Sequence, residues 1–253
     1  MGPDGVRCLR CGPEPASGRT HVVVVPGLGV LGYLVPLLRE LGRRAVTATL
    51  LDLPGFGSAR PRACEASVSA IGRTASDVLR YLSLAGALPA GGAVLVGHST
   101  GAQAAAHAAV AVQDDLPLAA VVLAGPTVAP TQRSLRRLLT AAPASFLADS
   151  PRQLPVLRDL LRGGQGTVAM LRSAVADRPE RVVAGLRVPL VVTAGRLDAI
   201  APRWWLDVLA RSAVRSPDVR VVTGPGSHNN PFTRPAGVAD IVDQCVNRRV
   251  GPA

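Results

Sequence analysis

Three residues of types that can perform nucleophilic catalysis occur along the chain in the order Ser99, Asp198 and His228. A serine hydroxyl is a weak nucleophile at neutral pH unless a base removes its proton during the attack, and a neutral imidazole can be that base. An aspartate can hold the imidazole in the required tautomer and stabilise the imidazolium that forms. These residue types predict catalysis by Ser99, provided that the fold brings the three side chains together.

Ser99 lies in the stretch 94–103, where an apolar run is followed by Gly-His-Ser-Thr-Gly and then by an alanine-rich run. This pattern predicts a strand, a tight turn and a helix, with the serine at the apex. Glycine on either side of the turn avoids a clash where the strand meets the helix. The N–H groups and the dipole at the helix N-terminus suit a developing negative charge. Considered alone, the motif also fits an ordinary Gly/Ser turn in a chain with 26 glycines, and the flanking strand and helix favour the catalytic interpretation.

Asp198 and His228 each follow an apolar run that reads as a buried strand. Asp198 comes just after the run 190–194, and His228 lies in Gly-Ser-His-Asn-Asn-Pro after the run 219–222. Ligands of open α/β sheets bind at the carboxyl ends of the strands, so these residues and Ser99 are expected to converge there. Asp198 could instead cap a helix that starts near Pro202, a role that is compatible with catalysis.

The chain alternates between short apolar runs and helical patterns, which predicts an α/β protein with a doubly wound, mostly parallel sheet. We expect strands at 22–25, 45–51, 93–96, 119–124, 190–194 and 219–222, and helices ending near 41, 87, 112 and 247. The first 20 residues contain only a hint of a strand, at 6–9. The rhythm breaks at 126–186, where proline-punctuated helical patterns without a convincing strand are expected at 131–141, 154–162, 167–176 and 180–186. We therefore predict a core formed by 1–125 and 187–253 and a helical cap formed by 126–186.

The chain resembles the α/β-hydrolase superfamily, in particular its capped serine hydrolases and esterases. The resemblance rests on the strand–turn–helix around Ser99 (the nucleophile elbow), on the order of the three residues, and on the segments Asp-Leu-Pro-Gly-Phe-Gly (52–57) and Val-Leu-Ala-Gly-Pro (122–126). The resemblance extends from His21 to the C-terminus. It implies a catalytic triad of Ser99, His228 and Asp198, and an oxyanion hole formed by the backbone N–H groups of Thr100 and Leu28. Many relatives carry His-Gly where this chain has Pro-Gly, at 26–27; proline supplies neither an N–H nor an imidazole, but the Leu28 N–H can still serve.

The resemblance implies hydrolysis of a carboxylic ester, lactone or thioester through an acyl-enzyme. The predicted cap is rich in aliphatic residues, which favours a small hydrophobic substrate, and Phe146, Met170 and Phe232 are our candidates for its pocket. Two alternatives stay open. The first is a C–C-bond hydrolase of the same fold, in which Arg196 or a cap arginine would bind a substrate carboxylate. The second is a non-catalytic member that binds a small ligand.

A net charge of +11 raises the question of a nucleic-acid partner. The basic residues are all arginines, scattered singly or in pairs, and only 3% of the chain is aromatic, which argues against such a partner. The absence of lysine excludes a Walker-type P-loop and a pyridoxal Schiff base. We expect a small-molecule substrate, no cofactor, no metal and no nucleic acid.

Cys8 and Cys11 form a CxxC pair, which could be half a zinc site or a redox pair, but no second pair accompanies it, and free thiols in a reducing compartment explain it as well. The histidines His21, His98 and His107 are expected to be structural. No signal peptide or membrane span is visible, since the apolar segment 21–41 is interrupted by Pro and Gly. We expect a soluble, cytoplasmic protein.

Overall fold

The computed structural model of the chain describes residues 5–14, 20–55, 63–138, 140 and 164–247. Within these residues the strands form one sheet in the order β1-β3-β2-β4-β5-β6-β7, in which β1 is antiparallel to β3 and all other pairs are parallel. The strands are β1 Cys8–Cys11, β2 His21–Val25, β3 Ala48–Leu51, β4 Ala93–His98, β5 Leu118–Ala124, β6 Leu190–Gly195 and β7 Val219–Gly224. The predicted mostly parallel, doubly wound sheet is confirmed.

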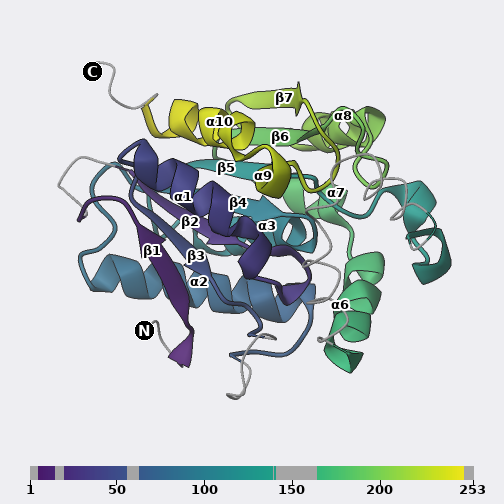
Figure 1. Cartoon of the computed structure of the whole chain (residues 1–253), viewed down its shortest axis with the longest axis horizontal. Helices are drawn as coiled ribbons and strands as arrows, with labels where there is room; N and C mark the ends of the chain where they lie inside the picture. The colour runs from purple at the N-terminus through teal and green to yellow at the C-terminus, as the bar shows by residue number, and fades with distance from the viewer. Residues whose placement is uncertain (1–4, 15–19, 56–62, 139, 141–163, 248–253) are drawn as a thin grey trace.

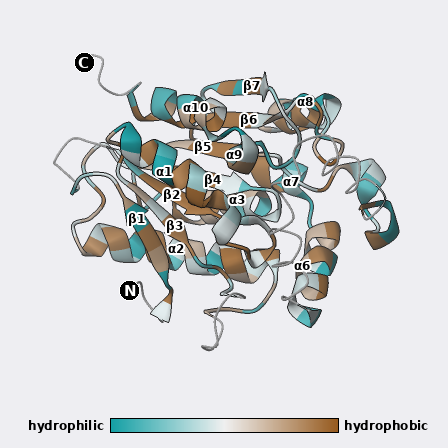
Figure 2. Cartoon of the chain, in the orientation of Figure 1, coloured by the Kyte–Doolittle hydropathy of each residue, from teal (hydrophilic) through white to brown (hydrophobic). Residues whose placement is uncertain are grey.

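Helices cover both faces of the sheet (Figure 1). They are α1 Val35–Arg43, α2 Val68–Leu84, α3 Thr100–Val112, α6 Gln165–Ala176, α7 Pro179–Val183, α8 Arg203–Ser212, α9 Asn230–Thr233 and α10 Pro235–Asn247, with short 3-10 turns η2 Gly27–Gly29, η3 Gly32–Leu34 and η4 Pro130–Gln132. Helices α2, α3 and α8 pack on one face, and α1 and α10 pack on the other. Figure 2 shows the apolar strands enclosed between these helix layers.

Each central strand supplies residues to both apolar layers, because successive side chains of a strand point to opposite faces. In β2, Val23 and Val25 belong to the cluster beneath α2 and α3, whereas Val22 and Val24 belong to the cluster beneath α1 and α10. All four valines are buried. This double burial explains why the strand reads as an unbroken run of β-branched residues.

The third strand begins later than its apolar run predicts, at Ala48 instead of residue 45. The preceding residues complete the C-terminal turn of α1: the Val46 N–H donates to the Leu41 carbonyl, and Ala45 has a positive φ of 55°. The end of the helix therefore uses backbone groups that the sequence pattern assigned to the strand.

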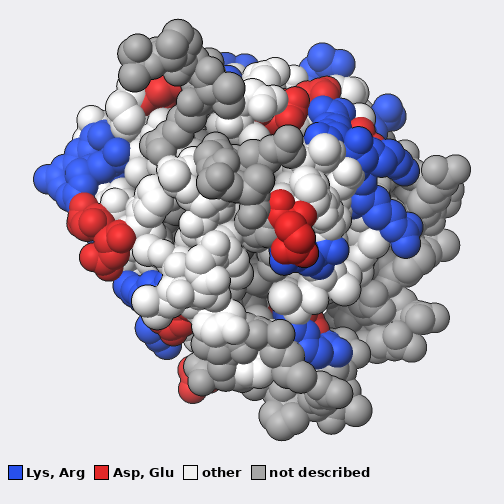
Figure 3. All heavy atoms as spheres, turned by 90° about the vertical axis from the view of Figure 1, so that its left-hand side faces the viewer, with Lys and Arg blue, Asp and Glu red and all other residues white. Residues whose placement is uncertain are grey.

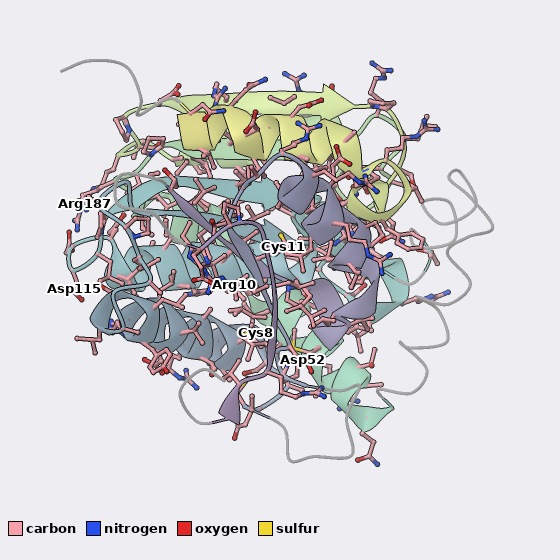
Figure 4. The ribbon with its side chains drawn as sticks, turned by 60° about the vertical axis from the view of Figure 1, so that its left-hand side comes forward. Cys8, Arg10, Cys11, Asp52, Asp115 and Arg187 are labelled. Carbon is pink, nitrogen blue, oxygen red and sulfur yellow. The ribbon has the colours of Figure 1, made fainter. Side chains whose placement is uncertain are left out.

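The first strand, Cys8–Cys11, begins two residues later than the hint at 6–9, and it carries both cysteines of the CxxC pair (Figure 4). Cys8 pairs in register with Leu51 and Cys11 with Ala48. Residues three apart on a strand face opposite sides of the sheet. The Cys11 thiol lies 3.0 Å from the Leu38 carbonyl on the α1 side, whereas Cys8 lines a cavity with Val78 of α2, and both thiols are free. The two sulfurs therefore cannot form a disulfide or bind one metal ion together.

The described part of the segment between β5 and β6 is helical and contains no strand. Residues 135–138 are helical, α6 covers the helix expected at 167–176, and α7 covers the first part of the one expected at 180–186. The helix expected at 154–162 lies outside the described residues. Helix α7 packs between α3 and α8, and α6 packs against α3 and η2. In Figure 1, α6 lies beyond the right-hand end of the sheet, below α7.

Many surface arginines are paired with carboxylates, and Figure 3 shows acidic side chains beside arginines on one face. The pairs include Arg44–Asp240, Arg80–Asp77, Arg133–Glu180, Arg187–Asp114 and Arg203–Asp207. These contacts neutralise part of the positive charge locally. In the part of the chain that the structure describes, none of the helices has the length and apolar character needed to span a bilayer.

The indole of Trp205 anchors the point where the chain leaves the sheet after β5. Trp205 is fully buried, and its Nε1–H donates to the Pro126 carbonyl at 2.9 Å. We predict that Trp205→Phe lowers the free energy of unfolding by about 1–3 kcal/mol, because a buried carbonyl loses its donor. Trp204→Phe is the matched control, since Trp204 is 44% exposed and its replacement should cost about 0.5 kcal/mol or less. Urea denaturation followed by circular dichroism measures both; equal losses would contradict the prediction.

Candidate active site

Ser99 occupies a tight turn between β4 and α3, with φ 58° and ψ −124°. A non-glycine residue in this region is strained, and such strain persists only where the surroundings enforce it. Here the Ser99 N–H donates to the Ala124 carbonyl, and the Ser99 carbonyl accepts from the Ala102 N–H. The flanking glycines are required by close approach: a Cβ at Gly97 would lie 2.3 Å from the Gly101 carbonyl oxygen, and a Cβ at Gly101 would lie 2.5 Å from the Val25 carbonyl oxygen.

The structure brings the predicted trio together. The Nε2 atom of His228 lies 2.9 Å from the Ser99 Oγ, and its Nδ1 atom lies 3.0 Å from the Asp198 Oδ2. Because an ionised carboxylate only accepts hydrogen bonds, the Nδ1 atom carries the proton and Nε2 accepts from the serine hydroxyl. This is the tautomer that a base for Ser99 requires.

The Asp198 carboxylate is held by its own loop. Its Oδ1 accepts from the N–H groups of Ile200 and Ala201 at 2.9 and 2.8 Å, which leaves Oδ2 for His228. Burial alone raises the pKa of Asp198, but the nearby His228 and the two backbone donors outweigh it and bring the pKa below its usual value. Helix α8 starts only at Arg203, and no side chain caps its N-terminus. Asp198 therefore stabilises the turn before the helix instead of capping the helix itself.

Ser99, Asp198 and His228 follow the carboxyl ends of β4, β6 and β7, which lie at the same edge of the sheet. The parallel arrangement places these ends side by side although the residues are far apart in the chain. Gly125, at the end of β5, completes the edge: a Cβ there would lie 3.2 Å from the His228 ring. The convergence expected from the sequence is therefore seen in the geometry.

The other histidines are satisfied elsewhere. His21 lies 3.1 Å from the Ala87 carbonyl and 2.9 Å from the Thr49 Oγ1, and His107 Nε2 lies 2.9 Å from the Asp177 Oδ1. His98 is adjacent to Ser99 but does not contact its hydroxyl; it is 2% exposed and bonds to the Tyr33 hydroxyl and the His228 carbonyl. Burial and the nearby His228 lower the pKa of His98 to about 3, so its imidazole is neutral at pH 7.

The two residues whose backbone N–H groups are expected to form an oxyanion hole, Leu28 and Thr100, are in contact. Thr100 is the first residue of α3, so its N–H belongs to the helix turn whose N–H groups have no partner within the helix. The Leu28 N–H, in a residue with φ 48°, donates to the Thr100 Oγ1 at 2.8 Å. The second expected donor is thus already oriented toward the elbow by the Thr100 side chain.

The three residues expected to line the pocket do not form one surface in the described structure. Met170 of α6 is fully buried in the cluster on the α2 and α3 side, whereas Phe232 of α9 packs against the cluster on the α1 side. Phe146 lies outside the described residues. The helical pattern of a segment does not reveal which face of the sheet that helix covers, so the different surroundings of Met170 and Phe232 could not be predicted from the sequence.

No local pattern in the sequence points to Tyr33 or to the side chain of Thr100. The Tyr33 hydroxyl contacts a residue 65 positions away and the Thr100 hydroxyl a residue 72 positions away. Neither contact has a local motif, and both arise only when the loop after β2 folds against the elbow.

Residues 22–241 match the model of the alpha/beta hydrolase family, and the chain therefore belongs to this family. No curated protein matches its sequence. An esterase from Thermogutta terrifontis has a similar structure, with 20% identity, a TM-score of 0.69 and coverage of 94% of this chain and 92% of that one. The enol-lactonase from Burkholderia xenovorans LB400 gives 15% identity, a TM-score of 0.71 and 96% of both chains. Bromoperoxidase from Bacillus anthracis has 13% identity and a TM-score of 0.71, with coverage of 96% of this chain and 95% of that one. At these identities the likeness shows the fold.

The buried neutral His98 predicts a loss of stability in mild acid. The unfolded chain binds a proton at this histidine below its usual pKa of about 6.5, whereas the folded protein does so only near pH 3. The free energy of unfolding therefore falls as the pH drops from about 6.5 toward 3, by up to ~1.4 kcal/mol per pH unit from His98. His21, whose pKa burial also lowers, acts in the same direction, whereas Asp198 contributes only below its usual pKa near 3.8.

Urea denaturation at pH 7 and pH 5 isolates the contribution of His98 when the wild type is compared with His98→Gln. The glutamine cannot titrate, so the variant should lose about 2 kcal/mol less than the wild type between the two pH values. Equal losses in both proteins would show that His98 does not change its protonation between the folded and unfolded chains.

Proposed function

We propose that this protein is a serine hydrolase that cleaves a carboxylic ester, lactone or thioester of a small hydrophobic substrate through an acyl-enzyme. One observation carries the proposal: Ser99, His228 and Asp198 form a continuous chain of hydrogen bonds, with the proton positions that nucleophilic attack requires. The chain belongs to a family of hydrolases, and an esterase and a lactonase are among its structural neighbours.

In this mechanism the Ser99 Oγ attacks the substrate carbonyl carbon while its proton passes to the His228 Nε2. The π electrons of the carbonyl move to its oxygen, which becomes the oxyanion, and Asp198 stabilises the imidazolium. Collapse of the intermediate breaks the bond to the leaving group, which takes the proton from His228. Water, deprotonated by His228, then attacks the acyl carbon of the acyl-enzyme. The bond from that carbon to the Ser99 Oγ breaks, the Oγ takes the proton back from His228, and the acid is released.

The N–H groups of Thr100 and Leu28 would bind the oxyanion, a contribution that typically amounts to about 10²–10³ in turnover for each donor. In the free protein the Leu28 N–H donates to the Thr100 hydroxyl. The oxyanion would join or replace this hydroxyl as acceptor. The donor is therefore kept satisfied, and oriented, until the substrate binds.

The segment 126–186 would act as a cap over the edge of the sheet that carries Ser99, with 1–125 and 187–253 as the core. Some of its described apolar side chains, Leu138 and Met170 among them, are buried in the cluster on the α3 side, so part of its aliphatic content serves packing. The C–C hydrolase alternative needs an arginine for a substrate carboxylate. Arg133 is paired with Glu180 and Arg196 is exposed, so neither supports that alternative over ester hydrolysis.

A fluorophosphonate tests the nucleophile directly. We predict a single adduct on Ser99, detected by intact mass and peptide mapping, because the His228 base is within hydrogen-bond distance of its hydroxyl. Ser99→Ala should abolish the adduct, and His228→Ala should slow its formation by orders of magnitude. His107→Ala is the matched control, since His107 contacts Asp177 instead, and should label like the wild type. A folded wild type that forms no adduct would contradict the proposal and favour a non-catalytic binding protein.

The hydrophobic substrate predicts a dependence of rate on acyl length. Across p-nitrophenyl acetate, butyrate and hexanoate, kcat/KM should rise by up to about fourfold per methylene, the equivalent of burying ~0.8 kcal/mol of CH₂. Rates that are independent of chain length would contradict the hydrophobic acyl site while leaving the nucleophile intact.

A further inference from the structure

Two buried side chains outside the Ser99–His228–Asp198 trio link the loops around it. Tyr33 lies in η3 and His98 ends β4; they are 5% and 2% exposed. The Tyr33 Oη lies 2.7 Å from the Gly27 backbone nitrogen and 2.7 Å from the His98 Nδ1. The His98 Nε2 lies 2.8 Å from the His228 carbonyl oxygen. Together these bonds form a bridge from Gly27 through Tyr33 and His98 to His228.

The proton positions in this bridge follow from its two ends. The His228 carbonyl can only accept, so the His98 Nε2 carries a proton. A neutral His98 then has a bare Nδ1, which accepts from the Tyr33 hydroxyl. The hydroxyl oxygen in turn accepts from the Gly27 N–H, and burial, which raises the pKa of Tyr33, keeps the phenol protonated. Every donor in the bridge thus has one acceptor, and every bond points in a single direction.

The bridge ends beside the groups that the proposed mechanism uses. Gly27 precedes Leu28, whose N–H is the proposed second oxyanion donor. His98 precedes Ser99, and the carbonyl at the far end belongs to His228 itself. The rings are packed as well as bonded: the Tyr33 and His98 centroids are 5.3 Å apart, and those of His98 and His228 are 5.1 Å apart. One buried pair therefore holds three separate loops at fixed distances from one another.

We propose that Tyr33 and His98 are positioning residues that set the catalytic imidazole of His228 and the oxyanion-binding loop at Leu28 in register with Ser99. The inference rests on the proposed serine hydrolase function and deepens it. A phenylalanine at position 33 would supply the same apolar ring. What the Tyr33 hydroxyl adds is its two hydrogen bonds, with Gly27 and His98. The imidazole of His98 takes no part in proton transfer and acts through its two bonds.

Removing the Tyr33 hydroxyl tests the half of the bridge nearest the oxyanion loop. Tyr33→Phe should lower kcat about 10- to 100-fold, because misplacement of a group by about 1 Å has effects of this size. KM should change much less, since the hydroxyl does not reach the substrate. Tyr81→Phe is the matched control: Tyr81 is 43% exposed on α2, and its variant should keep wild-type kcat.

Two amide variants of His98 separate the two bonds. An asparagine amide reaches about as far as Nδ1 and a glutamine amide about as far as Nε2. His98→Gln should keep the donor to the His228 carbonyl, lose the Tyr33 bond and behave like Tyr33→Phe. The double variant Tyr33→Phe/His98→Gln should then be no more than about twofold worse than either single change, because coupled residues are not additive. His98→Asn should keep the Tyr33 bond but release His228, and should move the pH at which kcat/KM is half-maximal.

Imidazole ¹H–¹⁵N NMR of the unliganded protein provides a readout without substrate. We expect His98 to be the Nε2–H tautomer from pH 5 to pH 8 and the His228 Nδ1–H signal to be displaced or lost in His98→Asn but retained in His98→Gln. An Nδ1–H tautomer at His98, or an unchanged His228 signal in His98→Asn, would overturn the proposal.

Labelling and ester hydrolysis by the wild type distinguish failure of this proposal from failure of the proposed function. If the wild type labels at Ser99 and hydrolyses esters but Tyr33→Phe and His98→Asn, both folded by circular dichroism, keep kcat within twofold, the bridge is not a positioning device. If the wild type neither labels nor hydrolyses, the proposed function fails and the NMR outcomes alone decide whether the bridge holds His228. If both variants fail to fold, the bridge is a folding element and the proposal is overturned.

Discussion

The close contact between β4 and α3 at Ser99 is the constraint on which the rest of the site depends. The turn is possible only because Gly97 and Gly101 let the two elements and the end of β2 meet without side chains between them. The strain at Ser99, with φ 58°, is held by backbone bonds to neighbouring segments instead of being relaxed locally. The hydroxyl that projects from this turn stands at the N-terminus of a helix, where N–H groups and dipole favour negative charge.

A parallel sheet explains how distant residues reach that turn. The residues Ser99, Asp198 and His228 follow three different strands, and parallel order places all three carboxyl ends on one edge. Strands such as β2 are buried on both faces, and their side chains are packed against helices on each side of the sheet. The loops beyond the edge carry the groups of the proposed mechanism. In the loop after β6, the Asp198 carboxylate is held by the backbone N–H groups of Ile200 and Ala201.

Features that depend on local sequence patterns could be predicted from the sequence alone. The strands, the turn at Ser99, the end of α10 at residue 247 and the approach of Asp198 and His228 to Ser99 could be predicted, because alternation, glycine spacing and chain order encode them. The start of β3 could not, because the turn of α1 at Ala45 competes for the same backbone. The different surroundings of Met170 and Phe232 were also hidden, as they depend on which side of the sheet each short element packs. Contacts such as Tyr33 with His98 join residues with no shared pattern.

His98 and His228 show how surroundings, not residue type, divide the work between two neighbouring imidazoles. Their ring centroids are 5.1 Å apart, and both are buried. His228 faces a carboxylate at Nδ1, which would compensate the positive charge that the proposed mechanism places on its ring. His98 faces a neutral phenol and a carbonyl, and burial next to His228 brings its pKa to about 3, so no proton is taken up there. A second cation in the site would oppose the imidazolium that the proposed mechanism forms. The surroundings of His98, which keep its imidazole neutral, are therefore compatible with that mechanism.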